Sequence, residues 1–190
     1  MSENIFRAYD IRGLYPSDLN EEIAYKIGAA LANKISTSRK AVVAMDGRLS
    51  GPHIKKSLIN GLTSHGIEVI DCGMLPTPML YFATKVLNIP NGFMVTGSHN
   101  PKDYNGIKMI VGDNPLFDKD IYALRDWIAN NVIQERLDNC MPSISSDIAD
   151  KYIKRIKEDV SIDLAGKFVI DCMNGITGSV IEKVTKAFNI

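Results

Sequence analysis

The chain has 190 residues, of which 45% are hydrophobic, and this is enough for one globular domain and part of another. Its 22 Lys and Arg residues balance 22 Asp and Glu residues, so no overall charge favours a nucleic acid or a membrane surface as partner. No apolar run approaches the ~20 residues of a membrane span, and the first residues lack the pattern of a signal peptide.

Strands and helices are predicted to alternate along the first part of the chain, because short apolar runs alternate with segments of helical spacing. In chain order we expect a strand over 5–11, a helix from Asn20 to Ile35, a strand over 41–45, a helix from Ser50 to His65, a strand over 67–71 and a helix from Thr77 to about Leu87. Strands over 93–95 and 106–111 and a helix from Asp118 to about Asn131 follow. The polar residue that opens each helix is expected to cap it.

Residues 134–146 break this pattern and are expected to form a linker. Beyond it we expect a helix from Asp147, a strand over 167–171 and a helix over 179–188. One strand and two helices bury too little apolar surface to stand as a domain. We therefore divide the chain into a first domain over 1–140 and the truncated start of a second α/β domain over 141–190.

The alternation predicts an α/β fold in which helices are layered on a sheet. The dipeptide Asn105-Gly106 is expected to turn the chain between strand 93–95 and its return strand, which adds an antiparallel pair and makes the sheet mixed. Ligands of such folds bind beyond the carboxyl ends of the parallel strands. The residues expected at that edge are Arg12, 46–48, Gly73 and Ser98.

A serine and a histidine stand side by side just after the strand over 93–95. The hydroxyl of Ser98 is a weak nucleophile on its own, and an adjacent base such as His99 would activate it. Lys102 and Lys108 lie close by in the sequence and would favour an anion, of which phosphate is the obvious one. For an arbitrary Ser-His pair, a plain surface turn is the more common explanation.

Four ordered motifs resemble those of the α-D-phosphohexomutases, most closely the bacterial phosphomannomutase/phosphoglucomutase group. They are Phe6-Arg7-Ala8-Tyr9-Asp10-Ile11-Arg12-Gly13, Asp46-Gly47-Arg48, Asp71-Cys72-Gly73-Met74-Leu75-Pro76-Thr77-Pro78 and Thr96-Gly97-Ser98-His99-Asn100-Pro101. The resemblance implies an enzyme that interconverts the 1-phosphates and 6-phosphates of mannose or glucose. Its implied partner is therefore a phosphosugar, and the oligomeric state stays open.

The resemblance also assigns roles to single residues. Ser98 would carry a phosphoryl group, with a hexose 1,6-bisphosphate as the intermediate. His99 would act as a general acid/base or as a charge partner, Arg12 and Lys108 would flank the phosphoserine, and Tyr9 would contact the substrate. Taken singly, each has a plainer explanation: a histidine bonded to a backbone carbonyl, a surface ion pair, a solvated lysine and a core aromatic.

Other polar residues near the serine are expected to have structural roles. Asp46 and Arg48 would orient the loop through an ion pair, and Thr96 and Asn100 would fix its bend through side-chain to backbone hydrogen bonds. The loop over 171–175 is a weak signal for a phosphate cradle, which a strand-to-helix turn explains equally well.

The family needs a divalent cation, usually Mg²⁺, held by an aspartate-rich loop that this sequence does not contain. Within this chain the resemblance leaves the metal one partner, the phosphoryl group on Ser98. The family's sugar-selecting segment and distal phosphate loop are missing as well. We therefore expect the chain to be the N-terminal part of a larger enzyme and to be inactive alone.

Two other classes of protein remain open from the residues themselves. One is a binding or regulatory module in which Ser98 is merely a phosphorylation site. The other is a Ser-His hydrolase, although its Gly-x-Ser-x-Gly elbow is absent because Asn100 replaces the second glycine. Neither class explains the three other motifs.

Cysteine usage indicates where such a protein would be found. Cys72, Cys140 and Cys172 are widely spaced, form no CxxC pair and give no disulfide framework. Reduced and mostly buried thiols are therefore expected, in a cytoplasmic protein.

Overall fold

The computed structural model describes residues 3–134, 142–145, 147–161 and 166–189. The described strands are β1 (Ile11–Leu14), β2 (Lys40–Met45), β3 (Glu68–Met74), β4 (Gly92–Val95), β5 (Tyr104–Val111), β6 (Asn114–Pro115) and β7 (Ser143–Ile144). The described helices are the 3-10 turn η1 (Glu3–Ile5) and α1 (Glu21–Lys34), α2 (Gly51–Thr63), α3 (Thr77–Val86), α4 (Lys119–Asn130), α5 (Ile148–Asp159) and α6 (Gly178–Phe188). None of these helices is long and apolar enough to cross a membrane.

The described strands form one mixed sheet in the order β1-β5-β4-β2-β3-β7, with β6 beside β5. Strand β2 runs parallel to β3 and β4, whereas β5 runs antiparallel to β1 and β4. The predicted α/β fold with a mixed sheet is therefore confirmed. Met45 and Val95, the last residues of β2 and β4, pair with each other, so the loops that follow them leave the same edge of the sheet.

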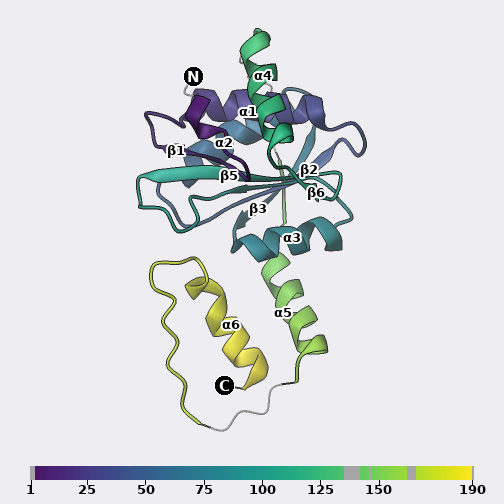
Figure 1. Ribbon diagram of the computed structural model, residues 1–190. Coiled ribbons are helices and arrows are strands. Elements are labelled where there is room, and N and C mark those ends of the chain that lie inside the picture. The colour runs from purple at the N-terminus through teal and green to yellow at the C-terminus, as the bar shows by residue number, and fades with distance from the viewer. Residues whose placement is uncertain (1–2, 135–141, 146, 162–165, 190) are drawn as a thin grey trace.

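Helices cover both faces of the sheet: α1, α2 and α4 lie on one face and α3 on the other (Figure 1). The central strands read as continuous apolar runs because both of their faces are buried. Val43 and Phe93 pack in the core under α1 and α2, whereas Val42 and Met94 pack in the core on the α3 side.

One of four predicted N-caps forms the expected hydrogen bond. The side chain of Asn20 accepts from a backbone N–H of the first turn of α1 at 3.0 Å. Ser50 occupies the cap position of α2, but its hydroxyl makes no cap bond. Pro76 rather than Thr77 precedes α3, and Asp118 makes no side-chain cap bond to α4.

The first predicted strand, over 5–11, is wrong. The chain instead forms η1 and reverses direction, with the Arg7 N–H donating to the Asp10 carbonyl at 3.0 Å, and Phe6 pairs with Ile11 in an isolated bridge. Phe6 and Ile11 are both buried. Apolar side chains can therefore be buried in a tight reversal as well as in an extended strand, and the apolar run alone does not distinguish the two.

The predicted turn at Asn105-Gly106 is also wrong, because both residues lie inside β5. The buried Asn105 amide donates to the Ser50 hydroxyl at 2.8 Å. A Cβ atom on Gly106 would lie 2.3 Å from the Ile11 carbonyl oxygen, so glycine is needed here for close approach of β1. The loop over 96–103 makes the reversal instead.

The last quarter of the chain extends the structure on the α3 side. Strand β7 pairs in parallel with β3, α5 packs on α3, and α6 packs on α5 (Figure 1). Ile148, Ile153 and Val180 belong to the core that α3 covers. The predicted linker over 134–146 lies partly outside the described residues, and its residues 143–144 form an edge strand rather than a linker.

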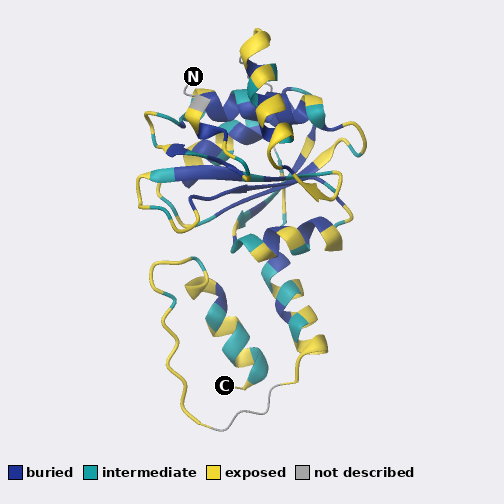
Figure 2. Cartoon of the chain, viewed as in Figure 1, coloured by how far each residue is buried: buried dark blue, intermediate teal, exposed yellow. Residues whose placement is uncertain are grey.

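The predicted strand over 167–171 is wrong as well. This segment has no regular structure and runs along the outside of the molecule, where it is exposed (Figure 2). Val169 is 99% exposed, and no described strand pairs with it. A strand needs a neighbour for its backbone N–H and C=O groups, and the apolar run alone does not supply one.

Candidate functional site

Ser98 lies in the loop that follows β4, and its side chain is exposed. Its φ angle is +53°, in the left-handed region that non-glycine residues seldom adopt. The Ser98 N–H donates to the Thr96 hydroxyl at 2.9 Å, and that hydroxyl donates to an Asp46 carboxylate oxygen at 2.7 Å. The predicted role of Thr96 in fixing the bend is confirmed.

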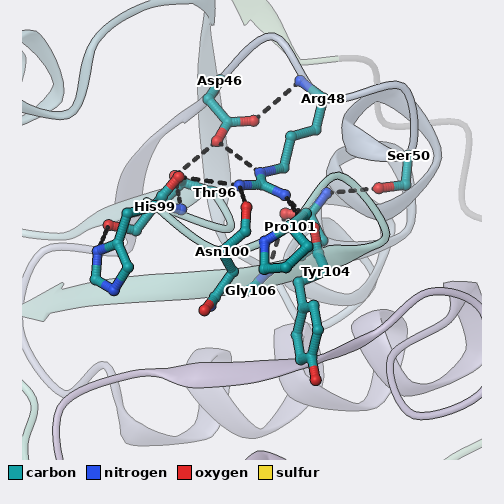
Figure 3. A network of polar contacts seen from close by, with 11 residues as sticks. Asp46, Arg48, Ser50, Thr96, His99, Asn100, Pro101, Tyr104 and Gly106 are labelled. Atoms are coloured by element: carbon teal, nitrogen blue, oxygen red, sulfur yellow. Dashed lines mark hydrogen bonds and ion pairs between the residues drawn. The ribbon is translucent and has the colours of Figure 1, made fainter. Parts of the chain in front are cut away.

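Arg48, in the loop after β2, binds the backbone of the serine loop through its side chain (Figure 3). Its guanidinium donates to four backbone carbonyl oxygens: Pro101 at 2.6 Å, Tyr104 at 2.8 Å, Ser98 at 2.9 Å and Asn100 at 2.6 Å. Its Nε lies 3.4 Å from the Asp46 carboxylate, which confirms the predicted ion pair. Arg48 binds the backbone carbonyl of Asn100, not its side chain. The amide nitrogen of the Asn100 side chain is buried without a partner, so the predicted side-chain to backbone bond is wrong.

A pocket of about 760 Å³ opens beside this loop. Its walls come from residues 46–50 after β2, residues 98–100 with Lys102, and residues 173–176 before α6. Tyr15 also lines it, and a hydrogen bond from Tyr15 to Glu21 raises the pKa of the tyrosine and lowers that of the glutamate. The loop identified as a weak phosphate cradle therefore faces the serine loop across one pocket.

His99 follows Ser98, and its Nδ1 lies 3.4 Å from the Ser98 Oγ, a long hydrogen bond. Both side chains are exposed. Within the described residues no carboxylate hydrogen-bonds to His99, so the third member of a hydrolase triad is missing there.

Arg12 and Lys108 form a second group, joined by a carboxylate that the sequence did not single out. Asp10 lies 2.6 Å from the Arg12 guanidinium and 3.4 Å from the Lys108 ammonium. Arg12 pairs with Gly106 of β5, and the Gly106 carbonyl accepts from the Thr96 N–H at 2.9 Å. Arg12 is thus level with the start of the serine loop. Its Nε is buried without a partner.

Two other predicted residues lie apart from the serine pocket. Tyr9 is 77% exposed, which excludes the alternative of a core aromatic. Gly73 precedes Met74, which pairs with Met45, and Met45 also pairs with Val95, so the expectation that Gly73 shares the serine's edge of the sheet is confirmed. It lines a smaller pocket near β7 rather than the serine pocket. Burial raises the pKa of the Cys72 thiol to about 11, as suits an unreactive core residue.

The described residues provide no group of three or more His, Cys, Asp or Glu side chains that could hold a metal ion. Both oxygens of Asp46, the carboxylate tied to the serine loop, are engaged: one by Thr96 and Arg48, the other by the Arg48 backbone N–H at 3.1 Å. A hard cation at Ser98 could therefore bind Asp46 only by displacing these partners.

Comparison with known proteins identifies the architecture that carries this site. The family described as "Phosphoglucomutase/phosphomannomutase, alpha/beta/alpha domain I" matches residues 3–135. A phosphomannomutase/phosphoglucomutase of Pseudomonas aeruginosa is 42% identical over 186 residues, which cover 97% of this chain and 40% of that protein. A phosphoglucomutase of Neisseria meningitidis serogroup B is 38% identical over 98% of this chain and 41% of its own length.

A solved structure agrees with these sequences. A phosphoglucomutase/phosphomannomutase family protein of Burkholderia thailandensis superimposes with a TM-score of 0.87 at 36% identity, over 100% of this chain and 43% of that one. The chain thus spans about two fifths of the length of the curated relatives it matches. Its sequence, its sheet and its order of motifs agree with one another: the chain belongs to the phosphoglucomutase/phosphomannomutase family.

Proposed function

We propose that this chain provides the phosphoryl-carrying part of an enzyme that interconverts hexose 1-phosphates and 6-phosphates of mannose or glucose. The observation that carries the proposal is the presentation of Ser98, exposed at a pocket of about 760 Å³ by a loop whose backbone is held in place. The names of the relatives, which are phosphomannomutases and phosphoglucomutases, support this substrate class.

In the proposed reaction the phosphoryl group moves from the Ser98 Oγ to a free hydroxyl of the hexose phosphate. The bond from phosphorus to Oγ breaks, a bond to the sugar oxygen forms, and the product is a hexose 1,6-bisphosphate. The bisphosphate then returns its other phosphoryl group to Ser98. His99 accepts and returns the hydroxyl proton, a role supported by the 3.4 Å between its Nδ1 and the Ser98 Oγ.

Cations are needed because a phosphoserine brings about −1.5 to −2 charges at pH 7. We assign Arg12 and Lys108 to the phosphoryl group and Tyr9 to the sugar phosphate. The position of the two cations supports this assignment, because Arg12 pairs with Gly106, whose carbonyl accepts from the Thr96 N–H at the start of the serine loop. Lys102 adds a further positive charge at the wall of the pocket.

We propose Mg²⁺ as the metal of the complete enzyme. Within this chain its partner would be the phosphoryl group on Ser98, and its carboxylate ligands would come from residues beyond the described ones. A bound Mg²⁺ would neutralise the charge that develops on a transferring phosphoryl group.

We also propose that residues 1–140 are one domain and 141–190 the start of a second. The family match supports a boundary in this region, because it ends at residue 135. The pocket would then lie between the two parts, since residues 173–176 face the serine loop across it. We place the protein in the cytoplasm, because Cys72 and Cys172 are free thiols.

Substitution of the serine tests the proposal. In the protein that carries this chain together with the segments its longer relatives possess, Ser98→Ala is expected to abolish mutase turnover, because no atom remains to carry the phosphoryl group. The measurement is a coupled assay of glucose 6-phosphate formed from glucose 1-phosphate. The matched control is Ser36→Ala, at an exposed serine of the α1–β2 loop, which is expected to retain full turnover. Unchanged turnover in Ser98→Ala would refute the proposal.

A further inference from the structure

We propose that Arg48 is the positioning residue of the serine loop. It touches none of the reacting atoms, but it holds the backbone around Ser98 and so controls the rate at which this serine exchanges a phosphoryl group. The inference rests on the proposed function of Ser98 and adds a requirement to it.

The first argument is the use of the guanidinium donors. Arginine carries five N–H groups in a rigid planar fork. In Arg48 the terminal nitrogens donate to three carbonyls of the loop and to that of Tyr104, the first residue of β5, and the Nε faces Asp46 at 3.4 Å. The guanidinium is thus fully used inside the protein, which leaves it as a part of the loop rather than as a ligand for substrate.

The second argument is the conformation that these bonds maintain. Carbonyl oxygens that converge on one point repel one another, and a cation at that point offsets the repulsion. One of these oxygens belongs to Ser98, whose positive φ is disfavoured for a residue with a side chain. Such a conformation persists where the surroundings over-determine it, and the Arg48 bonds supply that constraint.

The third argument is that both backbone groups of Ser98 are held from one segment. Its carbonyl accepts from Arg48, and its N–H donates to Thr96, whose hydroxyl is bound to Asp46. Asp46 also accepts from the Arg48 backbone N–H at 3.1 Å. The loop after β2 therefore fixes the peptide groups on both sides of the serine.

The fourth argument is the close approach of the loop to the guanidinium. A Cβ atom on Gly97 would lie 2.4 Å from the central carbon of the Arg48 guanidinium. Glycine is therefore required for the planar group to lie against the loop. A lysine would offer three donors on a point charge, which is too few for the four carbonyls and has the wrong shape.

Arg48→Lys tests the role, since it keeps the charge and removes the fork. A displacement of the serine by about 1 Å is expected to lower kcat by about a hundredfold, with a smaller change in KM, because the sugar contacts are untouched. The rate at which Ser98 is phosphorylated by glucose 1,6-bisphosphate, followed by intact mass, is expected to fall by the same factor. Both are measured in the full-length protein.

Arg39→Lys is the matched control. Arg39 also donates to three backbone carbonyls, those of Ala32, Ile35 and His65, but none of these residues lines the serine pocket. Its substitution is expected to cost stability without lowering the phosphorylation rate. Equal losses of phosphorylation in the two variants would show that Arg48 acts only through general stability and would overturn the proposal.

A second variant keeps the test decisive if Arg48→Lys does not fold. Gly97→Ala retains the arginine and forces its guanidinium away from the loop, so it is expected to lower the phosphorylation rate in the same way. A wild-type rate in a folded variant would overturn the positioning role alone. Failure of the unsubstituted protein to become phosphorylated on Ser98 would instead overturn the proposed function.

Discussion

Asp10 is the residue whose single carboxylate holds two cations in place. Its side chain is 10% exposed, and its partners Arg12 and Lys108 are 14% and 29% exposed. Removing one member of a group so far removed from water leaves the other charges without a partner, which costs more than breaking a surface ion pair. Asp10 thus keeps the two cations together at the level of the serine loop.

Asp10→Asn is expected to lower the free energy of unfolding by about 1–3 kcal/mol, because it removes hydrogen bonds to charged groups. Asp113→Asn is the matched control, since Asp113 pairs with Lys85 where the side chains are 52% and 67% exposed. The control is expected to change the free energy by less than about 1 kcal/mol. Urea denaturation of both variants provides the comparison, and equal effects would contradict the argument.

At the scale of elements, α1 and α2 approach each other closely through two glycines. A Cβ atom on Gly61 would lie 2.1 Å from the Tyr25 carbonyl oxygen, and one on Gly28 would lie 2.4 Å from the Leu58 carbonyl oxygen. The backbones of the two helices therefore touch, which is possible only because each carries a glycine at the crossing. The contact holds α2, and with it the loop that carries Arg48, against the rest of the layer.

Gly61→Ala tests this crossing. Alanine is favoured over glycine in a helix by about 1 kcal/mol, so propensity alone predicts stabilisation. We expect a net loss of about 1–3 kcal/mol instead, because the methyl group meets rigid backbone on the neighbouring helix. Lys56→Ala, at an exposed position of the same helix, is the control and should stay within about 0.5 kcal/mol. Thermal unfolding distinguishes the two effects, and a stabilised Gly61→Ala would disprove the crossing.

Elements that form through local interactions could be predicted from the sequence, and those that depend on distant partners could not. Helix α1 follows from the Asn20 cap and its apolar spacing, both of which are local. The segment over 167–171 has the composition of a strand but no described neighbour to pair with. The Asn105-Gly106 pair has the composition of a turn but is needed inside β5, where β1 approaches Gly106. In both cases tertiary contacts decide the outcome.

The site divides in the same way. The loop of Ser98 and the ion pair of Asp46 with Arg48 could be predicted, because motif and position point to them. The four carbonyl bonds of Arg48 could not, since they depend on where backbone oxygens point after folding. The contacts of Asp10 with Arg12 and Lys108 were not predicted, although the place of Asp10 beside Arg12 in the first motif indicates such a pair.

At the scale of the whole molecule, this chain carries some of the groups expected for phosphoryl transfer, while others are not found among its described residues. The serine, its histidine and nearby cations are present, together with one pocket that both parts of the chain line. The described residues provide no group of three or more His, Cys, Asp or Glu side chains that could hold a metal ion. The chain also spans about two fifths of the length of its relatives. In a phosphoryl transfer, positioning and charge stabilisation provide almost all of the rate, and both require the whole set of contacts.

The 190-residue chain by itself is therefore expected to fold but not to catalyse. Two buried clusters of apolar side chains flank its sheet and support folding. For turnover, the serine would have to act without the sugar contacts and metal ligands that we assign to the segments present in the longer relatives, so much of the contribution of proximity and electrostatics is lost.

The measurement is a coupled assay of the purified chain with glucose 1-phosphate, Mg²⁺ and glucose 1,6-bisphosphate, beside a full-length protein that includes it. Circular dichroism and thermal unfolding establish that the chain is folded, so that a lack of product reports on chemistry rather than on stability. We expect no glucose 6-phosphate above background from the chain and steady turnover from the full-length protein. Turnover by the chain within about tenfold of the full-length rate, a difference of only about 1.4 kcal/mol in activation free energy, would show that the machinery for transfer lies within these residues after all.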